Sequence, residues 1–585
     1  MKAGTPSAPR RARLFISAAA IVSLGGVLVF WQAETAVAQN VGATGAISGS
    51  VTADRGEVRA LRVQARDTIH RITYTVYTNK GRYRIADLPP STYEVRVLEP
   101  EFDSPVLTVD VRADGSATAD VALKAKPAMA AAELVEYDAL YPPGPGRDIL
   151  EQGCLPCHGP SGFHRRAGKT EQGWAAAFDR MDPRDRQAYE AEGRAPGERH
   201  PQFYARPMSP EQRAILIEYL ATNFPPGQEG RDLKKEPLIR NEDALAQAVW
   251  VNYELPPPQD TRAFANGQPR RSTHDVFPSQ ITPGLIWMAG PGNGSLVAVN
   301  THTLDFATRT KDRRIPDPND LNVRPHGVVE HDGLVYLTTT GTHDGVDEFN
   351  PETGRFTKYH APQAGGGSHT SRVDSKGNVW FTTIFGHGRV NRLDAATKDV
   401  TEYHPLEGEG IGVPHYYGIV VDGQDRVWVT GASAFAVAMY DPKTDRWTKY
   451  PTPHANRRIA IDPRGKVWTS NRFPNAITMI DPNTGQATDY KLPLQYGAPY
   501  EVWPDLAGNI WATDQEYHAL VKFDQTTKTF TYFPYPVPTG HIPKMEIDAQ
   551  GTLWFSIGRP SQLGGFTEKG NAGVGEADRS TARSR

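Results

Sequence analysis

The sequence predicts a multidomain, mainly β protein, in which a seven-bladed β-propeller and a small β-sandwich flank an all-α domain. The 585 residues exceed what one ordinary hydrophobic core can organise. High counts of Gly (54) and Pro (48), with 23 Tyr and 11 Trp, favour short strands and turns over long helices. A motif recurring seven times, about every 40 to 49 residues, dominates the C-terminal half and indicates a propeller.

The N-terminus reads as a targeting segment. Arg10, Arg11 and Arg13 form a positive region, residues 14–31 are apolar, and an Ala-Val-Ala site ends at Ala38. We therefore predict export to the periplasm of a Gram-negative cell. An uncleaved membrane anchor is the alternative, because the apolar run is just long enough to span a bilayer. The predicted division is a signal peptide (1–38), β-sandwich (42–125), cytochrome c domain (133–228), propeller (248–566) and disordered tail (567–585).

The C-terminal repeat pairs an Asp/Gly turn with an aromatic strand. The clearest copies are residues 374–382, 462–470, 505–513 and 548–556, with looser copies centred on Trp287, Tyr336 and Trp428. Each copy is read as four strands, the last ending in Tyr/Phe-x-x-Pro, which is typical of a propeller blade. The copy at Trp554 lacks this last strand, whereas residues 253–256 upstream carry its signature. We predict that this upstream strand closes the ring as the outer strand of blade seven.

The chain has only two cysteines, Cys154 and Cys157, and His158 follows them directly. C-x-x-C-H is the attachment signature of haem c, since two thiols on one helical turn bond to the porphyrin and the adjacent imidazole binds the iron. A zinc site would need a second ligand pair, and no cysteine remains to provide it. Residues 146–153 are expected to form a helix leading into the motif. We predict one covalent haem c per chain.

The sixth iron ligand stays open at this point. The candidates are Met181, Met208, His164 and His200, and an open site is the remaining alternative. Met181 closes a predicted helix over residues 173–181, whereas Met208 precedes a Ser209-Pro210 cap that opens the next helix. The region resembles small bacterial cytochrome c domains, in which a Trp-to-"RM" helix follows C-x-x-C-H and a later helix ends in "YL". That resemblance favours Met181 as the metal ligand opposite His158, with Met208 second.

The segment before the cytochrome motif alternates as strands do. Residues 81–90 read GRYRIADLPP, and residues 92–97 read TYEVRV. This pattern resembles the carboxypeptidase regulatory-like β-sandwich. The resemblance implies an all-β spacer or binding module without chemistry of its own.

The propeller repeat, over residues 250 to 565, resembles the streptogramin B lyase (virginiamycin B lyase) family. Pro325-His326-Gly327 and Pro414-His415 match its catalytic-histidine pattern. The resemblance implies opening of a cyclic ester by elimination, with a histidine base and a magnesium ion. The family often has Glu after its Trp-bearing strand. Here the corresponding residues are Thr383, Gly431, Asn471 and Ile557, and only Asp514 is acidic.

Histidines gather at equivalent repeat positions. Five fall ten to thirteen residues before the blade aromatic: His274, His326, His369, His415 and His541. Three fall seven after it: His343, His387 and His518. Lys544, Glu501, Tyr500 and Arg457 occupy equivalent channel positions. Both sets are expected on one face, around the mouth of the central channel.

Imidazole can act as a base near neutral pH and suits copper, zinc or iron. We therefore predict a catalytic set of His326, His369, His415 and His541. A second metal at the channel mouth, either magnesium or a transition metal, is part of this hypothesis.

The preferred interpretation is an exported mono-haem cytochrome with electron-transfer activity. Its propeller would bind or oxidise a small molecule and pass electrons through the haem to a periplasmic redox partner. A lyase with an accessory haem domain and a non-catalytic binding or sensing propeller are the alternatives. The formal charge of −3, with no basic run beyond the N-terminus, argues against a nucleic-acid partner. Membrane association is expected only if the signal segment is uncleaved.

Overall fold

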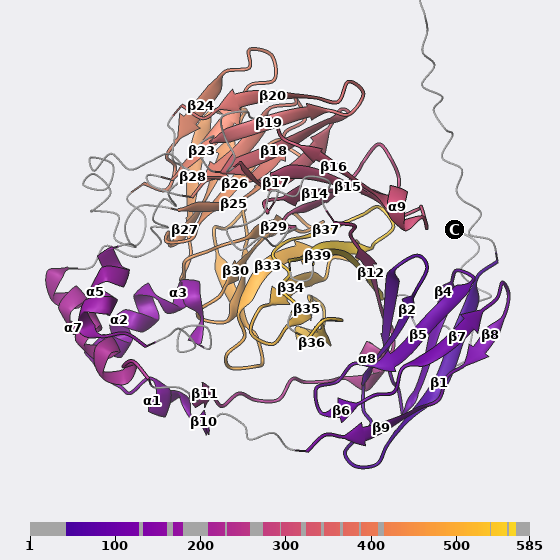
Figure 1. Ribbon diagram of the computed structural model, residues 1–585. Coiled ribbons are helices and arrows are strands. Elements are labelled where there is room, and N and C mark those ends of the chain that lie inside the picture. Colours follow the sequence, from indigo (N-terminus) through magenta and orange to yellow (C-terminus); the bar gives the residue numbers. More distant parts are fainter. Residues whose placement is uncertain are drawn as a thin grey trace, which may run out of the picture.

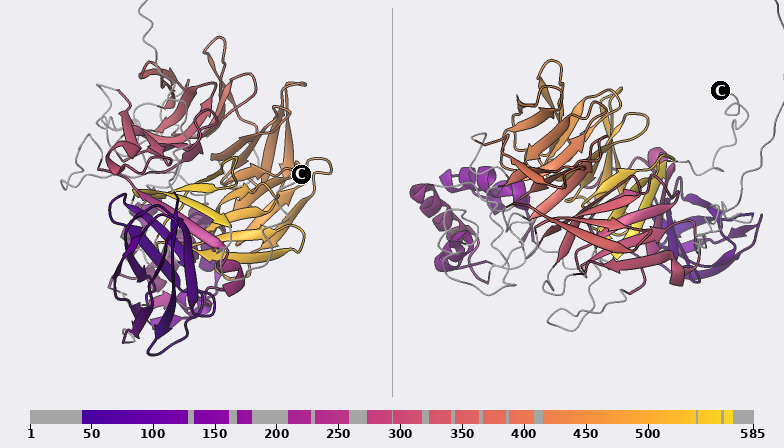
Figure 2. Two further views of the ribbon diagram at one scale, coloured as in Figure 1. Left: turned by 90° about the vertical axis from the view of Figure 1, so that its right-hand side faces the viewer. Right: turned by 90° about the horizontal axis from the view of Figure 1, so that it is seen from above.

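The computed structural model shows a mainly β protein with few helices (Figures 1 and 2). It describes residues 43–127, 133–160, 168–179, 209–227, 231–257, 273–292, 294–316, 323–340, 344–362, 367–384, 388–407, 415–538, 540–558 and 561–568. The predicted signal peptide and the candidate ligands Met181, Met208, His164 and His200 lie outside these residues. Within the described ranges, no helix combines the length and apolar character needed to cross a membrane.

The C-terminal half forms a β-propeller of seven antiparallel blades. Blade one holds β13 (Val276–Pro278), β14 (Leu285–Gly290), β15 (Ser295–Asn300), α9 (Phe306–Arg309) and β16 (Thr310–Arg314). Blade two holds β17 (Arg324–His331), β18 (Leu334–Thr340), β19 (Gly345–Asn350) and β20 (Arg355–His360). Blade three holds β21 (Ser368–Val373), β22 (Val379–Thr383), β23 (Arg389–Leu393) and β24 (Val400–Tyr403). Blade four holds β25 (Tyr416–Val421), β26 (Val427–Gly431), β27 (Ala436–Asp441) and β28 (Arg446–Pro451).

The remaining blades complete the ring. Blade five holds β29 (Ile459–Ile461), β30 (Val467–Asn471), β31 (Ala476–Ile480) and β32 (Ala487–Lys491). Blade six holds β33 (Pro499–Pro504), β34 (Ile510–Asp514), β35 (Ala519–Asp524) and β36 (Thr529–Pro534). Blade seven holds β37 (Met545–Ile547), β38 (Leu553–Gly558), β39 (Ser561–Glu568) and β12 (Ala248–Glu254). The innermost strands contact one another in cyclic order, from β13 through β17 to β37 and back to β13.

Strand β12 closes the ring, as the sequence predicts. It pairs antiparallel with β39, which makes it the fourth strand of blade seven although it precedes blade one in the chain. Strand β39 runs to Glu568, two residues into the stretch predicted as a tail.

A repeated Asp and Trp explain the second strand of blades three to seven. In blade five, Asp462 Oδ1 accepts from the N–H groups of Arg464 and Lys466 at 2.9 Å, which fixes the turn. Its Oδ2 accepts from Trp468 Nε1 at 3.0 Å, so the buried indole leaves no donor unpaired. The same pairing joins Asp374 to Trp380, Asp422 to Trp428, Asp505 to Trp511 and Asp548 to Trp554.

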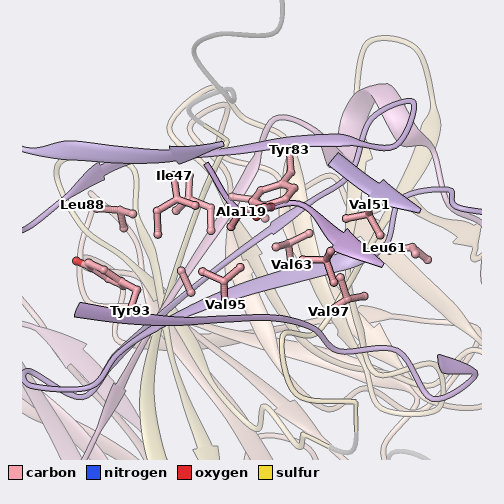
Figure 3. Packing of buried hydrophobic residues seen from close by; sticks show 14 of the residues in the cluster. Ile47, Val51, Leu61, Val63, Tyr83, Leu88, Tyr93, Val95, Val97 and Ala119 are labelled. Carbon is pink, nitrogen blue, oxygen red and sulfur yellow. Dashed lines mark hydrogen bonds between the residues drawn. The ribbon is translucent and has the colours of Figure 1, made fainter. Parts of the chain in front are cut away.

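The N-terminal unit is a two-sheet sandwich. Its strands are β1 (Gly45–Ala53), β2 (Arg62–Asp67), β3 (Ile72–Tyr77), β4 (Arg82–Leu88), β5 (Ser91–Val97), β6 (Phe102–Asp103), β7 (Leu107–Val111), β8 (Ser116–Thr118) and β9 (Val121–Ala125). One sheet has the order β4-β1-β9-β6 with β8 on β1, and the other runs β3-β2-β5-β7. Ile47, Val63, Tyr83 and Val95 interdigitate between the sheets (Figure 3).

The sandwich is continuous with the propeller. Strand β3 pairs with the free edge of β12, giving one eight-stranded sheet of order β37-β38-β39-β12-β3-β2-β5-β7. Across the junction, Trp250 Nε1 donates to Tyr77 Oη at 3.0 Å, and Tyr77 Oη donates to the carbonyl of Pro534 in blade six. The sequence predicts a separate spacer, whereas the structure shows an edge-paired module.

The segment between these units is small and mostly helical. It contains β10 (Glu133–Val135), α1 (Tyr137–Leu140), α2 (Pro145–Gly153), α3 (Leu155–His158), α5 (Glu171–Asp179), α7 (Pro210–Asn223), β11 (Arg231–Leu233) and α8 (Glu242–Leu245). The predicted cap is present: Ser209 and Gln212 form a reciprocal capping box before α7. Because β10 and β11 form a parallel ribbon, the described segment is mixed, and an all-α cytochrome domain is not evident in it.

Candidate functional site at the channel mouth

A hydroxyl on the second strand of most blades positions the residues that face the channel. In blade three, Thr382 Oγ1 accepts from the N–H of Thr370 at 3.2 Å and lies 3.0 Å from the carbonyl of Tyr417 in blade four. The same bond to the next blade joins Thr338 to His369, Thr430 to Arg457, Ser470 to Tyr500 and Ser556 to His274. Ala289 occupies this position in blade one and has no hydroxyl. The channel-facing residues are thus held through their own carbonyls.

Three imidazoles and two phenols form an arc, which we call the channel ring: His274, His326, His369, Tyr417 and Tyr500. The ring centroids of His274 and His326 are 3.9 Å apart, as are those of His326 and His369. Tyr417 follows at 4.2 Å from His369, and its hydroxyl bonds to that of Tyr500. His541 lies beside the arc, with its ring 6.0 Å from Tyr500.

Each imidazole of the channel ring uses Nδ1 for an internal hydrogen bond. His274 Nδ1 lies 2.7 Å from Asp275 Oδ1, and His326 Nδ1 lies 3.1 Å from the carbonyl of His369. His369 Nδ1 lies 2.8 Å from the Thr370 hydroxyl, which can donate or accept, and 3.2 Å from the carbonyl of Tyr417. A carbonyl can only accept, so His326 Nδ1 carries the hydrogen and the neutral ring keeps a lone pair on Nε2.

The surroundings of His326 and His369 favour the neutral form of these two imidazoles. Burial lowers the pKa of His326 well below 6.5, and the nearby His274 and Arg458 lower it further. Burial likewise lowers the pKa of His369, followed by His326 and Arg458. Burial alone would raise the pKa of Asp275, but the bond from His274 and the charge of Arg458 outweigh it and hold that pKa below its ordinary value. Neutral imidazoles beside a carboxylate can accept protons or bind a metal.

Beneath the channel ring, buried charges run along the channel. Arg458 lies 3.9 Å from Asp275 and 3.5 Å from Glu501. Lys544 lies 3.6 Å from Glu501 and 3.1 Å from Glu546. All five side chains are buried. Unpaired charges there would be costly, so this alternation of signs holds the channel in one arrangement.

The opposite mouth of the channel opens into a cavity of about 740 Å³. Arg372, Trp503, Glu546, Phe277 and Glu330 contribute to its lining. Arg372 pairs with Glu546 at 2.5 Å, which links this cavity to the buried charges. None of the predicted catalytic histidines lines it.

The structure separates the predicted histidines. His326 and His369 lie in the channel ring, together with His274. His415 is buried two residues before Tyr417, which takes the ring position; burial and then Arg457 lower the pKa of His415 to about 4. His541 lies beside the ring with an exposed side chain; partial desolvation, then His274 and Arg472, lower its pKa to about 4.

The loop histidines also differ. His518 Nδ1 lies 3.1 Å from the carbonyl of Gly540, whereas His343 and His387 fall outside the described residues. Asp275, Tyr417 and Arg458 are ring or channel residues that the pattern missed. A fixed count of eleven residues before the aromatic, as for His369 and Trp380, selects Tyr417 rather than His415 for blade four.

The C-x-x-C-H segment lies against the propeller on the side of the channel ring. Helix α3 approaches β30 (Figure 1), and a Cβ added at Gly159, next to His158, would lie 3.3 Å from Arg472 Nε. Arg472 follows β30 directly and is the same side chain whose charge lowers the pKa of His541. Tyr137 stacks on Tyr496 of the propeller with ring centroids 5.8 Å apart. The segment is therefore packed onto blades five and six.

Comparisons with known proteins concern the two β units. Residues 46–124 match the carboxypeptidase regulatory-like domain. Among solved structures, a streptogramin B lyase is 20% identical, with 51% of this chain and 94% of that chain covered and a TM-score of 0.45. A virginiamycin B lyase from Staphylococcus aureus is 17% identical, with 51% and 95% covered and a TM-score of 0.44. YCF48 from Cyanidioschyzon merolae is 13% identical, with 54% and 98% covered and a TM-score of 0.42.

No curated protein matches the chain. At these identities the likeness to solved structures concerns the fold, and the strand topology establishes it independently. The chain carries a carboxypeptidase regulatory-like domain joined edge to edge to a β-propeller.

Proposed function

We propose that this chain is an exported mono-haem c-type cytochrome with electron-transfer activity, whose channel ring binds or oxidises a small molecule. The observation that carries the proposal is the position of α3. The C-x-x-C-H turn packs onto the propeller through Gly159 and Arg472, on the side of the imidazoles. A redox group on this turn would lie near the site where a substrate is bound.

The residues present fit a covalently attached haem. Cys154, Cys157 and His158 occupy one turn, with the N–H of His158 donating to the carbonyl of Cys154 at 2.9 Å. Cys154 is buried in an apolar cluster that includes Leu155 and Trp174, and such a wall suits a porphyrin edge. The two cysteines would hold the haem and His158 would bind its iron, with Met181, or else Met208, as the candidate second ligand. When bound, this group supplies one-electron transfer.

The channel ring supplies the groups for handling a substrate. His326 holds its Nδ1 hydrogen on the carbonyl of His369, so its Nε2 can take a proton from a bound hydroxyl or amine. The Arg457 guanidinium lies 5.3 Å from the Tyr417 ring and 5.6 Å from the Tyr500 ring, which places a positive charge beside the tyrosines of the channel ring, away from His274 and His326. A small polar molecule with an acidic group would be oriented between these two sides. Electrons leaving the haem would pass to a periplasmic redox partner.

The lyase is the second candidate, because His326 lies at the channel with Nε2 available. Asp514, the one acidic residue at the family's Glu positions, is buried, and its Oδ1 accepts three backbone N–H groups, from Ala498, Glu516 and Tyr517. This carboxylate serves the loop after β34. A magnesium-dependent elimination would therefore need carboxylates from elsewhere.

The decisive experiment is covalent haem content of the full chain, matured with haem in a bacterial periplasm. One iron per chain, retained on a denaturing gel, is expected, because the two thioether bonds survive unfolding. Cys154→Ala with Cys157→Ala should lose it. In the oxidised protein, Met181→Ala should abolish the sulfur-to-iron charge-transfer band, whereas Met208→Ala should keep it.

Absence of covalent haem from the mature chain would overturn the cytochrome proposal. Opening of a cyclic ester without any change in the haem spectrum would favour the lyase. Ligand binding without either reaction would favour a sensing propeller.

A further inference from the structure

Three neighbouring blades present their imidazoles in one common way. In all three histidines Nδ1 is engaged by a protein oxygen: the Asp275 carboxylate for His274, the His369 carbonyl for His326, and both the Thr370 hydroxyl and the Tyr417 carbonyl for His369. The rings follow one another with centroids 3.9 Å apart. Ordinary surface histidines do not repeat such a pattern on consecutive blades.

We propose that the channel ring binds one divalent first-row transition metal ion through imidazole nitrogens of His274 and His326, with the Asp275 carboxylate beside them and His369 next along the arc. The inference deepens the proposed function by giving the ring a second metal centre. A redox role for this metal rests on the proposed cytochrome function, whereas metal binding by the ring is independent of the haem.

The hydrogen bonds at Nδ1 are those that metal-binding imidazoles make. A ligating histidine almost always donates its other N–H to a carboxylate or a backbone carbonyl, which fixes the ring and raises its basicity. Asp275 does this for His274, and two carbonyls do it for His326 and His369. The carbonyls are themselves fixed, because Thr338 and Thr382 also bond to them. The orienting groups are therefore in place without the ion.

The spacing is close to what a metal requires. One ligand atom from each of His274, Asp275 and His326 can be chosen so that all lie within 4.8 Å of one another. Metal–nitrogen bonds of about 2.0–2.1 Å need ligand atoms within about 4 Å of each other. The limit of 4.8 Å is slightly wider than that distance, and His369 lies next along the arc from these three groups.

The donor set selects the class of metal. Imidazole nitrogen suits copper, zinc, nickel and iron, whereas magnesium takes oxygen ligands. The charges facing the channel-ring imidazoles are Asp275 and Arg458 beneath, and Glu501, Lys544 and Arg457 beyond. These are two carboxylates and three cations, so the ion would be held by the imidazole nitrogens and the adjacent Asp275 rather than by the field of the surrounding charges.

The test is the metal stoichiometry of the full chain, stripped with a chelator and reloaded with Cu²⁺ or Zn²⁺. One non-haem equivalent per chain is expected after removal of free metal. The Cu²⁺ form should show nitrogen splitting in its EPR spectrum. His274→Ala and His326→Ala should each weaken binding at least tenfold. Asp275→Asn keeps the size of the orienting group and should weaken it about 10- to 100-fold.

His302→Ala is the matched control, because His302 is an exposed imidazole on the outer side of blade one. It should bind metal as the parent does. Failure of the parent to retain near-stoichiometric metal, or unchanged binding by both His326→Ala and Asp275→Asn, overturns the proposal. Retained binding in the haem-free Cys154→Ala/Cys157→Ala chain supports it even if the cytochrome proposal fails.

Discussion

The two arcs of the channel are built on one backbone frame and carry different chemistry. Blades one to three present His274, His326 and His369, whereas blades four to six present Tyr417, Arg457 and Tyr500 at the corresponding positions. Hydroxyls from the second strands hold carbonyls in both arcs. The repeat therefore fixes where a side chain is placed, and single substitutions at that place decide what it does.

The second arc is stabilised by charge. The Arg458 guanidinium lies 5.3 Å from the Tyr417 ring centroid and contacts Glu501 from below. The first arc has no buried ion pair of its own beyond Asp275, which it shares with Arg458. We infer that the tyrosine–arginine arc supports the channel and that the histidine arc is available to bind ligands.

The largest expected effect comes from breaking the charged arc. Arg458→Met leaves Asp275 and Glu501 buried beside one fewer cation, and should lower the free energy of unfolding by about 3–5 kcal/mol. Arg458→Met combined with Glu501→Leu should recover a good part of this loss, because the stranded carboxylate is gone. Urea unfolding followed by tryptophan fluorescence measures both. If Arg458→Met lowers the free energy of unfolding by less than about 1 kcal/mol, the charged arc does not stabilise the channel.

An effect of intermediate size is expected in the pH dependence of stability, because blade six has a titratable residue where blade five has a neutral one. Burial raises the pKa of Asp514 from 3.8 to about 6, whereas blade five has the neutral Asn471 at this place. The folded protein holds this proton more tightly than the unfolded chain. Its contribution to stability is therefore present below about pH 4 and is lost as the pH rises through about 6, by at most about 3 kcal/mol.

Asp514→Asn copies blade five and removes this titration. The stability of the variant relative to the parent should rise between pH 4 and pH 7, measured as the difference in unfolding free energy. Parallel pH profiles for parent and variant would show that Asp514 titrates normally.

The smallest effects concern the hydroxyls between blades. Thr430→Val removes the bonds to Gly418 and Arg457 and should cost about 1–2 kcal/mol. Ala289→Ser adds the hydroxyl that blade one lacks, near the carbonyl of His326, and should gain up to about 1 kcal/mol. Thermal unfolding midpoints of both variants measure this. Opposite signs are expected; a destabilised Ala289→Ser would mean that the first junction has no room for the bond.

Much of the fold is readable because its repeat is local. The Asp of the turn and the indole six residues later bond to each other. The turn and strand geometry of the copies at Trp380, Trp468 and Trp511 can therefore be predicted from a few neighbouring residues. The closing strand at residues 253–256 is also predictable, since its signature is the one that the last blade lacks. The capping box at Ser209 follows from four consecutive residues.

The site was only partly predictable because its register depends on contacts between blades. His326 and His369 lie in the channel ring. In blade four the sequence pattern selects His415 because it is a histidine, whereas Tyr417 occupies the equivalent position in the ring. Asp275 and Arg458 matter through partners far away in the chain, and no local pattern marks them. The pairing of β3 with β12 likewise joins segments almost two hundred residues apart.

That eight-stranded sheet has a consequence for the segment inserted within it. The chain leaves the sandwich after β9, which lies in its other sheet, forms the helical segment, and enters the eight-stranded sheet at β12, beside β3 of the sandwich. Both ends of the helical segment are therefore anchored by strands that are paired within sheets. If its packing on blades five and six loosens, the C-x-x-C-H turn can move only as far as the connections to β9 and β12 allow. Its effective concentration at the propeller face would stay high, and every return would be an intramolecular event.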